Sequence, residues 1–341
     1  MKTIAAFLLA SSLTLSAATF SERDVTVVNH RDGVTLAGTL TAPDDGSPRA
    51  AIILASGSGS QNRDEEVAGH RPFKTIAEYL SDRGYAVLRL DDRGVGGSSG
   101  DSPNSTTDDL ARDMSAAIAM LDSLYDKVPA GVLGHSEGGV TAVKCANADS
   151  LCRFIVTLAA PAWSGDSIVM SQTRAIAVAM TGRWDEEATQ RRLLDIVMSP
   201  TSDFIAKTLL RNELTARLGE SAKMPQVAQQ IEQSVSVMLS PAYRSLVRCN
   251  PEATMRRVAV PWLALNGSRD TQVLPDNLKT IKEYNPQADT VLIDGHNHLF
   301  QPCITGLANE YASITSDISD MTLEAIVTWL DKTTASLTQK P

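Results

Sequence analysis

Residues 134–139 read GHSEGG, a Gly-x-Ser-x-Gly motif with Ser136 at its centre. An apolar run typical of a strand ends at Gly134, and a helical pattern begins at Glu137. A serine on a sharp strand-to-helix turn has a strained backbone, and bulky neighbours two residues away would collide, which explains Gly134 and Gly138. The N-terminus of the following helix favours negative charge developing nearby. The motif predicts a nucleophile at Ser136.

A serine hydroxyl needs a base to take its proton, and the usual base is a histidine held by a carboxylate. On a strand-to-helix turn of this kind the chain order is serine, then the acid, then histidine. Of five histidines, only His296 and His298 lie after a later strand-end carboxylate. The base is therefore expected from this pair.

The acid is predicted to be Asp270, because it follows an expected strand, residues 260–265, through the short segment 266–269. An aspartate after a glycine can also serve only to form a turn. Asp276 and Asp294 are the reserve candidates for the acid.

The elements around these residues predict a mainly parallel sheet. Segments 25–30 and 34–42 flank Arg31-Asp32-Gly33 and indicate an antiparallel hairpin. Beyond the hairpin, apolar runs alternate with helical patterns, which is typical of βαβ units in a sheet buried on both faces. The expected strands are 50–55, 85–90, 130–134 and 154–158, and the expected helices are 72–83, 107–125 and 137–146.

Strand patterns disappear between Pro161 and Arg257, where several amphipathic helices are broken at Ser199-Pro200 and Ser240-Pro241. This segment is predicted to be a helical cap inserted into the core. Strands resume at 260–265 and 290–293, and 320–332 is expected to be a closing helix. The domain prediction is a first core part at 19–160, a cap at 161–257 and a second core part at 258–341.

Five sequence blocks, in this order along the chain, resemble the α/β-hydrolase superfamily, and within it bacterial secreted carboxylesterases related to the serine aminopeptidase-like hydrolases. The resemblance implies an α/β-hydrolase fold, a Ser-His-Asp triad acting through an acyl-enzyme, and no cofactor or metal. It selects His298 over His296, because the histidine of the Asn-His-Leu-Phe block is catalytic in those proteins. The five blocks are residues 56–65, 91–98, 134–139, 265–270 and 297–301.

The oxyanion formed during ester attack needs at least two oriented donors. One is expected to be the backbone N–H of Glu137, the residue after the nucleophile. The other is expected to be the N–H of Ser58, in a glycine-rich loop that replaces the more familiar His-Gly opening. A phosphate-cradling loop is the rival interpretation, but no Walker lysine follows.

The functional prediction is hydrolysis of small carboxylic esters with short acyl chains, a preference that comes from the resemblance. Two alternatives stay open: an aminopeptidase-like serine hydrolase and a catalytically inactive binding module. Six of the ten methionines lie in the cap, where they either repack around substrates or fill the cap's own core. These six are Met170, Met180, Met198, Met224, Met238 and Met255.

Charged residues also flank the expected oxyanion loop. Arg63, Asp64 and Glu65 form either a solvated cluster or a support for this loop or for substrate. Arg93 is expected to brace its own loop rather than to act in catalysis.

The N-terminus resembles a secretory signal peptide: Lys2 is followed by an apolar run and by small residues up to Ala18. We therefore expect residues 1–18 to be removed and the protein to be secreted or periplasmic, with no membrane anchor after cleavage. The net charge of −9 argues against nucleic acid and anionic membranes as partners. The expected partner is a small-molecule ester, and the sequence indicates no oligomeric state.

Four cysteines allow two disulfides, with three possible pairings, or four buried thiols. Their spacing is not that of metal ligands. They are Cys145, Cys152, Cys249 and Cys303.

Overall fold

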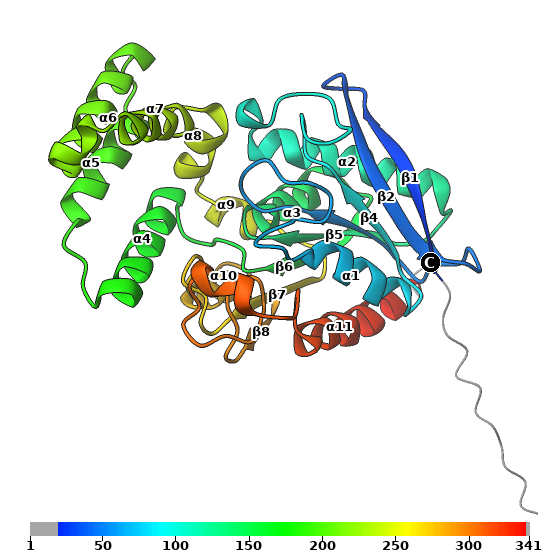
Figure 1. Ribbon diagram of the computed structural model, residues 1–341. Coiled ribbons are helices and arrows are strands. Elements are labelled where there is room, and N and C mark those ends of the chain that lie inside the picture. Colours follow the sequence, from blue (N-terminus) through cyan, green and yellow to red (C-terminus); the bar gives the residue numbers. More distant parts are fainter. Residues whose placement is uncertain (1–19, 339–341) are drawn as a thin grey trace, which may run out of the picture.

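The computed structural model describes residues 20–338 and contains an eight-stranded sheet with the order β1-β2-β4-β3-β5-β6-β7-β8 (Figure 1). The predicted signal peptide lies outside the described residues. The strands are β1 (Phe20–Asn29), β2 (Val34–Pro43), β3 (Ala51–Ala55), β4 (Ala86–Leu90), β5 (Ala130–His135), β6 (Cys152–Leu158), β7 (Trp262–Gly267) and β8 (Asp289–Ile293).

The predicted hairpin is formed by β1 and β2, which pair antiparallel along their full length. Its turn contains Gly33 in the left-handed region, with φ of 67°. The side chain of Asn29 accepts the N–H of Asp32 at 3.1 Å and stabilises the same turn. Strand β2 also pairs antiparallel with β4, and all other neighbouring strands are parallel.

Helices cover both faces of the sheet, as β3 shows most directly. Ile52 and Leu54 belong to the same buried cluster as residues of α1 and α11, whereas Ala51 and Ile53 belong to a second cluster with residues of α2, α3 and α10. A strand buried on both faces has no polar alternation, which is why β3 is apolar throughout. The predicted fold class is therefore confirmed. These helices are α1 (Pro72–Ser81), α2 (Thr107–Leu124), α3 (Glu137–Ala148), α10 (Asp276–Tyr284) and α11 (Asp320–Thr338).

The sequence pattern did not predict α10, which lies between β7 and β8. The helix has nine residues, and only Leu278 and Ile281 are apolar and buried. Two positions are too few to establish a helical period, so this helix depends on packing against the sheet.

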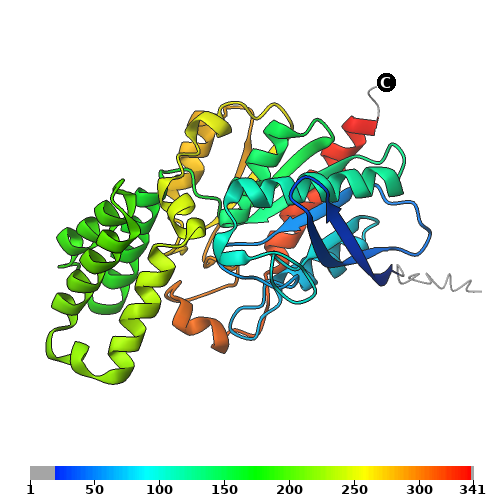
Figure 2. The same ribbon diagram turned by 90° about the horizontal axis from the view of Figure 1, so that it is seen from above.

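The segment predicted as the cap is helical and gathers at one end of the sheet (Figures 1 and 2). It has a small core of its own, in which Leu193, Leu210, Ile231 and Val235 are buried. The last helix of the segment returns to the main core through Met255. The helices are α4 (Gly165–Thr181), α5 (Glu187–Met198), α6 (Asp203–Leu218), α7 (Pro225–Met238), α8 (Pro241–Arg248) and α9 (Glu252–Met255).

Three short 3-10 helices complete the described secondary structure: η1 (Ser102–Asn104), η2 (Gly219–Lys223) and η3 (Ala308–Ser313). All four cysteines are free thiols, with Cys145 and Cys152 buried in the main core. Within residues 20–338, no helix has the length and apolar character needed to cross a membrane.

Candidate active site

Ser136 occupies the turn between β5 and α3, with φ of 53° and ψ of −121°. A non-glycine residue in this region is strained and needs its surroundings to hold it. Its N–H donates to the carbonyl of Leu158 on the adjacent strand at 2.8 Å, and its own carbonyl accepts the N–H of Gly139 at 2.9 Å. The hydroxyl is thereby presented at the carboxyl end of the sheet.

The glycines of the motif are required by close backbone contacts. A Cβ at Gly134 would lie 2.0 Å from the carbonyl oxygen of Gly138, and a Cβ at Gly138 would lie 2.0 Å from that of Ala55. Both distances are far inside van der Waals contact. The steric reason predicted for the motif is therefore the one found in the structure.

Asp270 and His298 form a buried pair. The Oδ2 atom of Asp270 accepts a hydrogen bond from Nδ1 of His298 at 2.8 Å, and the residues are 2 % and 4 % exposed. The Oδ1 atom of Asp270 accepts the backbone N–H groups of Gln272 at 2.8 Å and Val273 at 3.0 Å. A carboxylate held in this way places a proton on Nδ1 of His298 and leaves Nε2 free to act as a base.

The reserve candidates lie elsewhere. Asp276 is on α10 with Lys279 as its partner, and Asp294 accepts the hydroxyl of Ser268. His296 is buried with its Nδ1 atom 2.6 Å from the carbonyl of Asp294, and it is not among the residues that line the cavity around Ser136.

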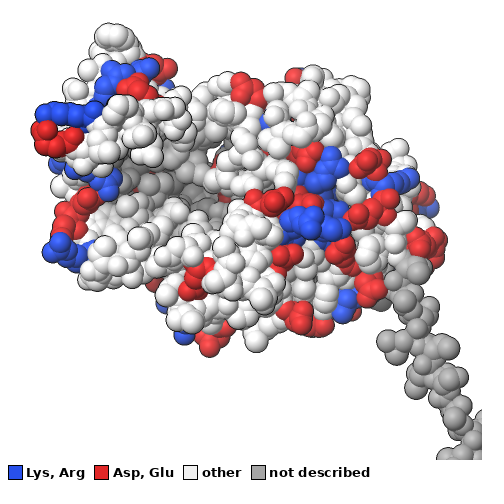
Figure 3. Space-filling view, viewed as in Figure 1, with Lys and Arg blue, Asp and Glu red and all other residues white. Residues whose placement is uncertain are grey.

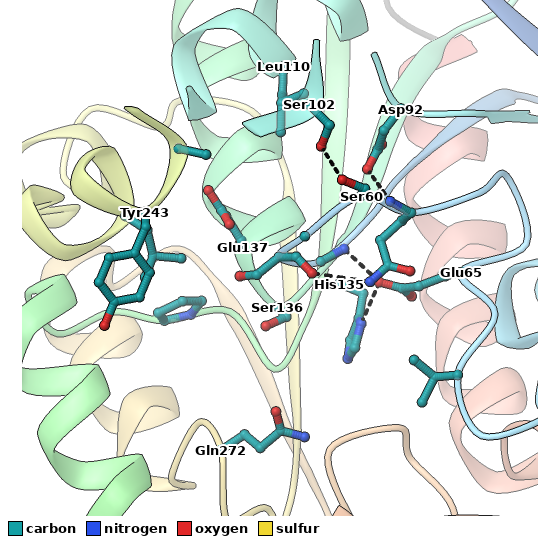
Figure 4. Close-up of a pocket in the computed structure, with 18 of the residues that line it drawn as sticks. Ser60, Glu65, Asp92, Ser102, Leu110, His135, Ser136, Glu137, Tyr243 and Gln272 are labelled. Carbon is teal, nitrogen blue, oxygen red and sulfur yellow. Dashed lines mark hydrogen bonds and ion pairs between the residues drawn. The ribbon is translucent and has the colours of Figure 1, made fainter. Parts of the chain in front are cut away.

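That cavity has a volume of about 770 Å³ and opens between the sheet and the cap, where the surface is hollowed (Figure 3). Ser136, His298, Glu137 and Ser58 all line it, and Asp270 lies behind His298. Figure 4 shows Ser136 at the centre of the lining side chains. No hydrogen bond joins Ser136 to His298 among the described residues, which is common before substrate binds.

The expected oxyanion donors belong to two segments next to Ser136, the start of α3 and the loop after β3. Glu137 begins α3, so its N–H is at the helix N-terminus. The loop after β3 approaches so closely that a Cβ at Gly57 would lie 3.3 Å from that of Ser136. The N–H of Gly57 donates to Glu65 at 2.6 Å and is therefore not free, whereas Ser58, the next residue of this loop, lines the cavity.

Two carboxyl groups beside the nucleophile have raised pKa values. The pKa of Asp92 is raised to about 7, mainly by burial and in addition by the charges of Glu65 and Glu137, while the hydrogen bonds of Ser56 and Gln61 act in the opposite direction. Burial likewise raises the pKa of Glu137. The Asp92 carboxyl is therefore partly protonated near neutral pH.

The charge cluster at 63–65 supports its loop. Arg63 pairs with Asp91 at 2.8 Å, and Asp64 pairs with Arg89. Glu65 is only 3 % exposed and contacts His135 at 2.9 Å. The solvated-cluster alternative does not describe these side chains.

Arg93 pairs with Asp113 and Asp32, each at 2.6 Å, in agreement with the expected bracing role. Sequence reasoning assigned no role to the side chain of His135. Its only signal was its place inside the GHSEGG motif, since its partner Glu65 lies far away in sequence.

None of the six cap methionines lines the cavity within the described part of the chain. The idea that they repack around substrate is therefore wrong. Met255 packs in the main core, Met238 packs against the cap core, and Met180 and Met224 are exposed. The lining residues that the cap supplies are Pro161, Ile168, Val169, Gln172, Ser236, Val237, Ser240, Ala242, Tyr243 and Leu246.

Comparison with known proteins identifies similar chains. A family model described as serine aminopeptidase, S33, matches residues 46–299. The esterase EstD of Thermotoga maritima is 24% identical over 284 residues, which is 82% of this chain and 60% of that protein. The chain thus spans less than two thirds of this curated relative.

Solved structures show the same fold. An esterase of Pyrococcus furiosus superposes with a TM-score of 0.59 at 17% identity, covering 98% of this chain and 99% of its own. A thermophilic esterase of Thermogutta terrifontis gives a TM-score of 0.54 at 20% identity, covering 91% of this chain and 99% of its own. These likenesses establish an α/β-hydrolase fold.

Proposed function

Because this chain belongs to the serine aminopeptidase S33 family of hydrolases, we propose that it is a serine hydrolase acting on carboxylic esters through Ser136, His298 and Asp270. The observation that carries this proposal is the bond between Asp270 and His298 beside a cavity that also holds the strained Ser136. The similarity to the esterase EstD in sequence, and to a solved esterase in fold, supports the same class of reaction.

The reaction has two steps. Oγ of Ser136 attacks the ester carbonyl while Nε2 of His298 takes the hydroxyl proton. The N–H groups of Glu137 and Ser58 stabilise the oxyanion. Collapse of the tetrahedral intermediate breaks the C–O bond, and His298 gives its proton to the leaving alcohol. A water molecule, deprotonated by His298, then releases the acid from the acyl-enzyme.

The proposed substrates are small esters with short acyl chains and a variable alcohol part. The cavity volume of about 770 Å³ lies within the range of ligand pockets and exceeds what an acetyl group fills. A short acyl group therefore leaves room for an alcohol of considerable size. The mostly apolar side chains that the cap supplies favour an apolar alcohol.

The aminopeptidase-like alternative needs a carboxylate to bind the substrate's α-ammonium group. The lining residues contributed by the cap include no carboxylate among the described residues. On the core side the lining carboxylates are Glu65, Asp92 and Glu137. Glu65 is already bonded to Gly57 and His135, and the raised pKa values of Asp92 and Glu137 weaken them as permanent anions. Comparing an aryl acetate with an aminoacyl anilide distinguishes the two activities.

Export remains part of the proposal, with cleavage after Ala18. The N-terminal mass of the protein recovered from the periplasm or medium tests it. A mature chain beginning at Thr19 supports export, and a full-length intracellular chain contradicts it.

The proposed function is tested by aryl acetate hydrolysis with the wild type and Ser136→Ala. We expect turnover by the wild type and a loss of kcat of roughly three to six orders of magnitude in the variant. A wild type that binds aryl esters but does not hydrolyse them would instead support the inactive binding module.

A further inference from the structure

Glu65 and His135 connect the two loops that complete the site. Oε1 of Glu65 accepts the N–H of Gly57 at 2.6 Å and lies 2.9 Å from Nδ1 of His135. Nε2 of His135 lies 3.0 Å from the carbonyl oxygen of His298. One continuous chain of hydrogen bonds therefore joins the expected oxyanion loop to the loop that carries the base. Figure 4 shows its central part, between Glu65 and His135.

The hydrogen-bond partners of His135 determine how many protons Glu65 and His135 carry together. A carbonyl oxygen only accepts, so Nε2 of His135 must carry a hydrogen. The bond between Nδ1 and Oε1 needs a second hydrogen, supplied by an imidazolium or by a protonated Glu65. In both states the pair holds one proton more than a neutral imidazole beside a carboxylate.

Resting on the proposed function, we propose that Glu65 and His135 are positioning residues. Their shared proton holds the loops that carry Ser58 and His298 at the correct distance from Ser136. Neither side chain needs to touch the reacting atoms. Their burial, at 3 % and 5 % exposed, is far greater than a solvated ion pair has.

The backbone of Glu65 shows that its surroundings impose this arrangement. Its φ of 51° lies in the left-handed region, which a glutamate adopts only when its neighbours hold it there. Its N–H donates to the carbonyl of Asn62 at 2.9 Å, and the ion pairs of Arg63 and Asp64 hold the residues just before it. The side chain is therefore presented to Gly57 and His135 at a fixed position.

Small displacements at this point reach the nucleophile. A Cβ at Gly57 would lie 3.0 Å from Oε1 of Glu65 and 3.3 Å from the Cβ of Ser136. The loop at Gly57 therefore packs closely between the side chains of Glu65 and Ser136. The imidazole ring of His135 also lies next to the ring of His298, with their centroids 4.7 Å apart. Misplacing reacting groups by about 1 Å can cost about 100-fold in rate.

The shared proton also predicts a pH dependence. Burial lowers the pKa of His135, but the charge and hydrogen bond of Glu65, with the carbonyl of His298 and the charge of Asp270, raise it overall. A histidine with a raised pKa keeps its stabilising contacts at low pH and loses them as pH rises through that pKa. Activity should therefore fall on the alkaline side when this proton leaves.

The test compares Glu65→Gln with Glu66→Gln, an adjacent exposed carboxylate outside the cavity lining. A glutamine cannot neutralise an imidazolium, and a neutral His135 makes only one of its two donor bonds. We expect Glu65→Gln to lower kcat by about 10- to 100-fold, with KM within about twofold, and to shift the alkaline limb to lower pH. Glu66→Gln should match the wild type.

Rates are measured on aryl acetate across the pH range and divided by the concentration of sites that react with a fluorophosphonate. His135→Asn and the double variant with Glu65→Gln complete a cycle. If Glu65→Gln fails to fold, the kcat and pH profile of His135→Asn provide the test by the same criteria. Non-additive losses in kcat support the shared role. An unchanged pH profile and kcat in Glu65→Gln, or strictly additive losses, overturn it.

The outcomes also separate this inference from the proposed function. A wild type without turnover refutes the esterase proposal and this role with it. An active wild type together with an unaffected Glu65→Gln refutes the positioning role alone.

Discussion

Replacing Asp270 by asparagine exchanges one oxygen for an NH₂ group and should remove most of the activity. Oδ1 of Asp270 accepts two backbone N–H groups, and Oδ2 accepts Nδ1–H of His298. An asparagine keeps the two backbone bonds only with its carbonyl oxygen at the Oδ1 position, and its NH₂ group then faces Nδ1. The imidazole must accept there and carry its proton on Nε2, the atom that has to take the proton of Ser136.

The opposite amide orientation does not rescue the base, because its NH₂ group would face two N–H donors and lose both bonds. We expect kcat to fall by about 10⁴-fold, or about 5.4 kcal/mol at 1.36 kcal/mol per decade. Aryl acetate turnover per folded protein measures the effect. The matched control is Asp276→Asn on the exposed part of α10.

A loss of less than about tenfold in Asp270→Asn would refute this assignment of the acid, as would an equal loss in Asp276→Asn. Thermal melts of both variants verify that the comparison is between folded proteins.

Three further predictions concern the base, the acidic side of the cavity and the acyl group. His298→Ala should abolish turnover, whereas His296→Ala should only weaken it; equal losses in kcat would show that the wrong histidine was chosen. Because burial raises the pKa of Asp92 to about 7, its native state binds more protons than the unfolded chain, so stability falls as pH rises from about 4 to about 7. Asp92→Asn should flatten that decline in Tm, and a parallel decline would contradict the shift. Among aryl acetate, butyrate, octanoate and palmitate, kcat/KM should be highest for the short acyl chains, and this ranking should change in a variant with a shortened cap. A preference for palmitate, or a ranking that the shortened cap leaves unchanged, would show that the cap does not set specificity.

The features that were predicted correctly from the sequence, such as the turn at Ser136 and the strand β3, depend on local backbone constraints. The turn at Ser136 requires Gly134 and Gly138 because backbone atoms lie 2.0 Å from the positions of their missing Cβ atoms, and such a requirement is visible in any sequence. The buried strand β3 can also be predicted from the sequence, since burial on both faces requires a continuous apolar run. Chain order then narrowed the base to two histidines, and the structure places one of them, His298, against Asp270.

Features that depend on packing between distant segments were not predictable. Glu65 and His135 meet because β3 and β5 are neighbours in the sheet, which brings the ends of both strands together. The sequence alone described Glu65 equally well as a solvated charge. Likewise, a count of methionines in the cap does not reveal which helix faces point toward the cavity.

The central claim is that Ser136 forms a covalent intermediate, and peptide mass spectrometry after reaction with a fluorophosphonate tests it most directly. We predict a single adduct on the peptide that contains Ser136, together with loss of aryl acetate turnover, and no adduct in Ser136→Ala. An adduct on another residue, or full turnover by an enzyme whose Ser136 is blocked, would contradict the account.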